Sequence, residues 1–90
     1  MAKLKIKKGF VLNEVDGEYI VAATGKNSLT FSGYICLNHT GKFLWDLLAR
    51  GISQKDLYKK FMKEFEIDFD IAKEDADAFL AKLKGADVIE

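Results

Sequence analysis

The spacing of apolar residues changes once along this chain, and that change constrains the fold more than any other sequence feature. Up to Leu37 the apolar residues lie in short β-favouring runs with a period close to two. After Leu37 the period becomes about 3.6, as in amphipathic helices. Strands therefore precede helices without alternation, which argues against a parallel βαβ sheet and favours an antiparallel sheet covered by helices.

The first strands are predicted to form a hairpin. Residues 10–12 and 19–22 are rich in β-favouring side chains, and polar residues separate them. Within that separation, Asp16 and Gly17 supply the positive-φ pair of a tight turn.

A second pair of short strands is predicted at residues 29–31 and 34–37, around a turn at residues 32–33. Because neighbouring side chains of a strand point to opposite faces, Ile35 and Leu37 share one face. Tyr34 and Cys36 share the other. The strand at residues 34–37 is the last in the sequence, so we expect it to form an edge of the sheet.

Three helices are predicted, each with a capping signal. Asn38 is a suitable N-cap for the first helix, which ends at Gly51. Ser53, with an aspartate three residues later, begins the second helix as an acidic variant of the capping box. Asp68 caps the third helix, and Gly85 is its expected stop. The inward-facing residues are predicted to be Leu44, Trp45, Leu47 and Leu48, then Leu57, Tyr58, Phe61, Met62 and Phe65, then Ala72, Ala76, Phe79, Leu80 and Leu83.

Length and composition predict one small domain, residues 1–90, with a modest core and no deep enzyme cleft. The chain is 49% hydrophobic and 31% charged, and it has a single cysteine, Cys36, so no internal disulfide. That cysteine usage is typical of a reducing compartment. Neither a signal peptide nor an apolar run of about 20 residues is present in the sequence, so we expect a cytoplasmic protein without a membrane segment.

Charge is balanced overall but not along the chain. Fourteen basic and fourteen acidic residues cancel, which weakens a general affinity for nucleic acid or anionic membranes. Residues 1–63 hold eleven basic and five acidic side chains, whereas residues 64–90 hold three and nine. The third helix is therefore predicted to be an acidic element on a mildly basic body.

The sequence carries no pattern that favours catalysis. Cys36 and His39 form a C-x-x-H pair, but a structural zinc site needs about four ligands. As a nucleophilic pair they lack an evident third group to orient the histidine. Acid–base catalysis needs two carboxylates in different environments, whereas the carboxylates of this chain are all expected to be solvated. No glycine-rich phosphate loop is present. We therefore expect no enzyme activity, no metal and no cofactor.

Composition and residue pattern leave two non-enzymatic functions open. A compact domain of strands and three helices also suits a winged-helix DNA-binding protein. Its recognition helix would be the second helix, with Lys55, Lys59, Lys60 and Lys63, although the acidic third helix would repel phosphate. A purely structural subunit, docked on an enzyme without touching its substrate, is the other alternative.

Residues 37–48 resemble a signature of the PqqD-like family of small peptide chaperones, also called RiPP recognition elements. In this signature a strand ends in Leu-Asn, which is followed by a variable residue and Thr-Gly. The helix that begins there has a Trp four residues after the Gly. Here these are Leu37-Asn38, Thr40-Gly41 and Trp45. The similarity continues through residues 52–53, 65–68 and 75–83, so it covers the chain from residue 9 onward. His39 departs from the pattern, since an acidic residue is common at this exposed first helical position.

This resemblance implies an α+β, winged-helix-like fold, with an antiparallel N-terminal sheet of three to four strands followed by three α-helices. It also implies a peptide-binding protein rather than an enzyme. Family members hold the leader segment of a ribosomally made precursor peptide and present it to a modifying enzyme, often a radical S-adenosylmethionine protein. The leader adds as a strand to the sheet edge, in a groove beside the third helix.

On this basis we expect a peptide groove formed by the edge strand and the third helix. Its expected residues are Tyr34, Ile35, Cys36 and Leu37 on the strand, and Asp75, Ala78, Phe79 and Lys82 on the helix. The carboxylates of Asp75 and Asp77 are expected to attract a basic leader. Nucleic acid and membrane are not expected partners, whereas an open edge strand also permits a homodimer through strand pairing.

Overall fold

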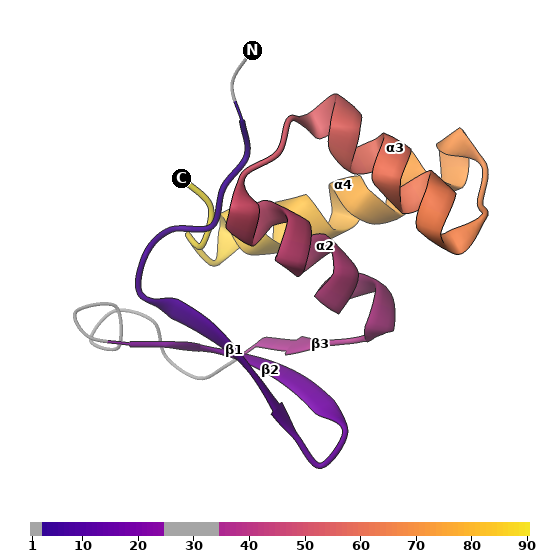
Figure 1. Cartoon of the computed structure of the whole chain (residues 1–90). Coiled ribbons are helices and arrows are strands. Elements are labelled where there is room, and N and C mark those ends of the chain that lie inside the picture. The colour runs from indigo at the N-terminus through magenta and orange to yellow at the C-terminus, as the bar shows by residue number, and fades with distance from the viewer. Residues whose placement is uncertain (1–2, 25–34) are drawn as a thin grey trace.

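The computed structural model describes residues 3–24 and 35–90, and Figure 1 shows the sheet on one side of the molecule with the helices on the other. The elements are β1 (Phe10–Val15), β2 (Glu18–Ala23), β3 (Ile35–Leu37), α2 (His39–Arg50), α3 (Gln54–Phe65) and α4 (Phe69–Gly85). The strands form an antiparallel sheet in the order β1-β2-β3. The prediction of an α+β fold, with strands first and helices after, is confirmed.

The hairpin between β1 and β2 turns where the sequence predicts it. Asp16 and Gly17 have φ angles of 52° and 82°, as the tight turn requires. Both strands are longer than predicted, because residues 13–15 continue the ladder until Val15 pairs with Glu18. The predicted strand at residues 29–31 and its turn lie outside the described residues.

β3 is an edge of the described sheet. Within residues 3–24 and 35–90 it pairs with β2 alone, through Tyr19–Leu37, Ile20–Cys36 and Val21–Ile35. Ile35 and Leu37 are buried, at 8% and 7% exposure, while Cys36 between them is exposed. The predicted alternation along this strand is therefore confirmed for its described residues.

Two of the three predicted helix caps form as expected. The Asn38 side chain accepts a hydrogen bond from the Gly41 N–H, and that of Ser53 accepts one from the Asp56 N–H. Asp68 is the N-cap residue of α4, as predicted, but its side chain makes no capping hydrogen bond. α4 ends at Gly85, the predicted stop.

The core lies between the inner face of the sheet and the three helices. Val21 of β2 is fully buried, and Trp45 of α2 is only 4% exposed, which confirms Trp45 as a core residue. α3 packs against α4 and against α2, and α2 in turn contacts β3. The other buried helical residues are Gly41, Leu44, Leu48, Leu57, Tyr58, Phe61, Ala72, Ala76, Leu80 and Leu83.

Residues near both ends of the chain pack against this core. Leu4 forms a β-bridge with Ile52, and Ile6 forms one with Ile89. Val88 between these segments is fully buried. The segment at residues 86–89 thus contributes to the core. Among the helices that the structure describes, none has the length and apolar content needed to cross a membrane.

Candidate functional site

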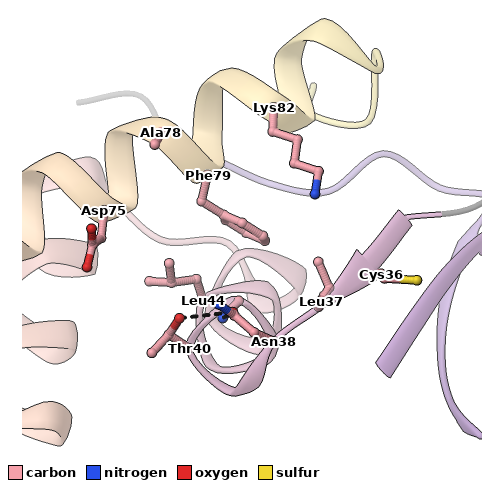
Figure 2. A pocket seen from close by; sticks show the side chains of 10 residues that line it. Cys36, Leu37, Asn38, Thr40, Leu44, Asp75, Ala78, Phe79 and Lys82 are labelled. Atoms are coloured by element: carbon pink, nitrogen blue, oxygen red, sulfur yellow. Dashed lines mark hydrogen bonds between the residues drawn. The ribbon is translucent and has the colours of Figure 1, made fainter. Parts of the chain in front are cut away.

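A groove of about 440 Å³ separates the end of β3 and the start of α2 from α4. Figure 2 shows residues of β3 and α2 on one side and the side chains of α4 on the other. The lining residues are Cys36, Leu37, Asn38, Thr40, Gly41, Leu44, Asp75, Ala78, Phe79 and Lys82.

Six of the eight residues expected at a groove are brought together here. These are Cys36, Leu37, Asp75, Ala78, Phe79 and Lys82. Ile35 is buried and does not line the groove. Tyr34 lies outside the described residues. The sequence interpretation also missed four lining residues that belong to the signature or follow it: Asn38, Thr40, Gly41 and Leu44.

The Leu-Asn-x-Thr-Gly signature builds the floor of the groove. The Asn38 side-chain oxygen lies 2.8 Å from the Gly41 nitrogen and 3.0 Å from the Thr40 hydroxyl, and both groups donate hydrogen bonds to it. The first bond caps α2 by satisfying one of its free N–H groups. The second fixes the orientation of the amide. Together they hold the junction of β3 and α2 in one geometry.

Gly41 is needed because three side chains crowd its α-carbon. A Cβ at this position would lie 3.1 Å from the Asn38 side-chain oxygen, 3.3 Å from the Phe79 ring and 3.4 Å from the Leu37 Cβ. The glycine therefore lets α4 approach the start of α2 closely, which places Phe79 over the floor of the groove.

One face of α4 forms the opposite wall. Asp75 and Lys82 are seven residues apart, two turns or about 10 Å along the helix, so they lie on the same face. Ala78 and Phe79 lie between them and supply an apolar surface (Figure 2). The wall thus carries a negative charge at one end and a positive charge at the other.

Asp77 does not line the groove, and the attraction of a basic leader by Asp75 and Asp77 stays a prediction. The Asp77 carboxylate accepts hydrogen bonds from the Lys73 ammonium at 2.7 Å and from the Tyr58 hydroxyl. The Lys73 bond, followed by that from Tyr58, holds the pKa of Asp77 below its usual value. Burial, and then the hydrogen bond to Asp77, raises the pKa of Tyr58. This cluster joins α3 to α4 on the flank away from the groove.

The described residues contain no arrangement of metal ligands: in residues 3–24 and 35–90, no group of three His, Cys, Asp or Glu side chains is placed to hold a metal ion. His39, the histidine of the C-x-x-H pair, packs edge-on against the Phe65 ring at a centroid distance of 6.1 Å. Its departure from the usual acidic residue thus gives α2 an aromatic contact with α3.

The fold and the groove define a small α+β domain in which a sheet edge faces a helix across an open depression. The model of the PqqD family, which is described as Coenzyme PQQ synthesis protein D, matches residues 9–89. The chain therefore belongs to the PqqD family.

A solved structure with the same fold is that of TbiB1 in complex with the TbiA(beta) leader peptide. It superposes with a TM-score of 0.77 at 23% sequence identity, over 96% of this chain and 94% of that one. At this identity the likeness establishes the fold. No curated protein matches the sequence.

Proposed function

We propose that this protein binds the leader segment of a ribosomally made precursor peptide, as a strand added to β3, and holds it for a modifying enzyme. The observation that carries the proposal is the β3 edge, which faces α4 across a groove of about 440 Å³. Membership of the PqqD family supports it, as does the shared fold with TbiB1, whose structure was solved with a leader peptide.

The β3 edge suits an added strand better than the β1 edge does. β1 is the other edge of the described sheet and is twice as long, with six residues against three. It contributes no residue to the groove, however. Edge strands bind peptides through the backbone and select them through pockets for alternate side chains. Only β3 combines both features within the described residues.

Apolar contacts must supply most of the affinity, because β3 is short. Alternate residues of a strand direct their backbone groups to opposite neighbours, so three residues offer about two to four hydrogen bonds to an added strand. At roughly 1 kcal/mol each, these contribute about 2–4 kcal/mol. Micromolar binding needs about 8 kcal/mol, before the cost of ordering the peptide. Leu37, Leu44 and Phe79 are the apolar surfaces that can supply the remainder.

The charges on α4 suggest which leader fits. Residues of an added strand that face the helix recur every second position, about 6.6 Å apart. An apolar anchor over Phe79 would then have charged neighbours two positions away on each side, within reach of Asp75 and Lys82. β3 runs from the Lys82 end of the groove toward the Asp75 end (Figure 2). A leader antiparallel to β3 would therefore carry its basic residue before the anchor and its acidic residue after it.

The wider role follows from the same proposal. The whole chain acts as one binding unit in the cytoplasm, without catalysis of its own, and the partner enzyme belongs to the radical S-adenosylmethionine class. The family assignment lends no support to the DNA-binding alternative. Dimerisation through strand pairing stays a prediction, which sedimentation of the free and peptide-bound protein would check.

The test is an NMR titration of isotope-labelled protein with a synthetic leader, taken from the short peptide gene expected beside the gene of this protein. Amide signals of residues 35–37 and 75–82 should shift, and a scrambled leader should leave them unchanged. Shifts confined to α3 would contradict the proposed site. Tight, salt-sensitive binding to duplex DNA, without a response to the leader, would favour the alternative function.

A further inference from the structure

A second depression, of about 700 Å³, lies between α3 and the first turns of α4. It is lined by Gln54, Lys55, Tyr58, Lys59, Met62, Phe69 and Lys73. None of these residues lines the groove beside β3. This surface is therefore a separate feature of the molecule.

The floor of this depression is apolar and partly open to solvent. Phe69, at the start of α4, is 48% exposed, which is high for a phenylalanine. Its ring packs edge-on against Tyr58 at a centroid distance of 5.8 Å, and Met62 completes the floor. Large exposed apolar surfaces next to a depression are typical of protein-binding sites.

The rim of the depression is positively charged. Lys55 and Lys59 lie one turn apart on α3, and neither forms an ion pair within the part of the chain that the structure describes. Lys73 borders the opposite side from α4, and its ammonium lies 2.7 Å from the Asp77 carboxylate. At least two of the three rim charges are therefore available to an acidic partner.

The depression and the groove lie on different flanks of α4. At 100° per residue, Asp75 is rotated by about 200° from Lys73 around the helix axis. Between α3 and α4, the Tyr58 hydroxyl is bonded to Asp77 and lies 2.6 Å from the Gln54 side-chain nitrogen. The Tyr58–Asp77 bond joins α3 to α4. Because the two surfaces share no lining residue, ligands on the two flanks need not compete.

We propose that this depression is a second protein-binding surface, which takes an acidic amphipathic segment of a partner protein. An apolar side chain of that segment sits between Tyr58, Met62 and Phe69, and its carboxylates meet Lys55 and Lys59. That the partner is the modifying enzyme rests on the proposed function. Duplex DNA would satisfy the lysines, but it has no group that fills the apolar floor.

The probe is a synthetic helical peptide with glutamates on one face and leucines and one phenylalanine on the other. Its counterpart has lysine in place of every glutamate. In an NMR titration the acidic peptide should shift the amides of residues 54–62 and 69–73, and the basic counterpart should not. The double variant Lys55→Glu, Lys59→Glu should weaken binding of the acidic peptide at least tenfold, about 1.4 kcal/mol.

The matched control is Lys60→Glu, Lys63→Glu. It makes the same change in net charge on the same helix, but neither residue lines the depression. This control should weaken binding less than twofold. Equal losses in both double variants, equal binding of the basic counterpart, or displacement of the acidic peptide by a short DNA duplex would each overturn the proposal.

A leader titration of the same samples separates this proposal from the function proposed above. Shifts in residues 35–37 that are unchanged in the Lys55→Glu, Lys59→Glu variant support two independent sites. If the leader has no effect while the acidic peptide binds as expected, the leader function fails and the second surface stands. If the leader binds while the acidic peptide does not, only the second surface fails.

Discussion

Replacing Phe79 with alanine is the sharpest perturbation of the groove. The ring projects from the middle of the α4 wall, close to Gly41, and it is half-buried in the free protein. Full burial of a phenylalanine side chain is worth about 1.5–3 kcal/mol. A bound leader covers only the part still open to solvent, so about half of that free energy is gained on binding. We expect the substitution to cost about 0.8–1.5 kcal/mol of affinity, a roughly four- to twelvefold increase in Kd.

The assay is calorimetric titration of a synthetic leader, with circular dichroism to verify that each variant is folded. Phe69→Ala is the matched control, because it removes a partly exposed phenylalanine from the opposite flank of the same helix. It should leave the Kd for the leader within twofold. A Phe79→Leu variant retains an apolar side chain and should lose less affinity than Phe79→Ala. Equal effects of Phe79→Ala and Phe69→Ala would refute the assignment of the groove as the binding site.

Further predictions concern helix caps, pH and charge. Asn38→Ala and Ser53→Ala should each lower the free energy of unfolding by about 1 kcal/mol in urea titrations. Only Asn38→Ala should also weaken leader binding, because Ser53 lies outside the groove. The lowered pKa of Asp77 means that its stabilisation is present above pH about 4 and is lost as the pH falls through that pKa. Wild type should therefore lose more stability than Asp77→Asn on acidification, and parallel curves would contradict this. The charge-swapped variant Asp75→Lys, Lys82→Asp keeps the net charge of the protein. It should nevertheless reverse the preference between two leaders that carry their basic and acidic residues in opposite order. An unchanged preference would exclude these two charges from recognition.

The helices were predictable because their signals are local. Asn38 and Ser53 lie directly before apolar residues with helical spacing, and both form the expected caps. Asp68 has the same type of position but makes no capping bond, since an N-cap residue type permits the bond without requiring it. β1 and β2 were predicted too short because Asn13, Glu14 and the exposed Val15 pair along the hairpin while facing solvent.

Contacts between distant residues could not be derived from local patterns. The bridges Leu4–Ile52 and Ile6–Ile89 join segments with no shared sequence signal, and they bring the tail into the core. The residues of the α4 wall were expected from the resemblance to the PqqD-like family, because the apolar stripe alone does not fix the rotation of the helix. The floor at Asn38, Thr40 and Gly41 was missed as lining, although its residues carry the family signature. Asn38 and Gly41 take part both in the cap of α2 and in its close approach to α4. The sequence predicted the cap but not the approach.

The brevity of β3 has a kinetic consequence for any peptide that docks there. An edge of three residues favours a Kd near micromolar rather than nanomolar. With an association rate constant of about 10⁶ M⁻¹s⁻¹, such a complex dissociates at about 1 s⁻¹. Enzymes commonly turn over at about 10 s⁻¹. A substrate would therefore stay long enough for several chemical events, and then leave without any separate release mechanism.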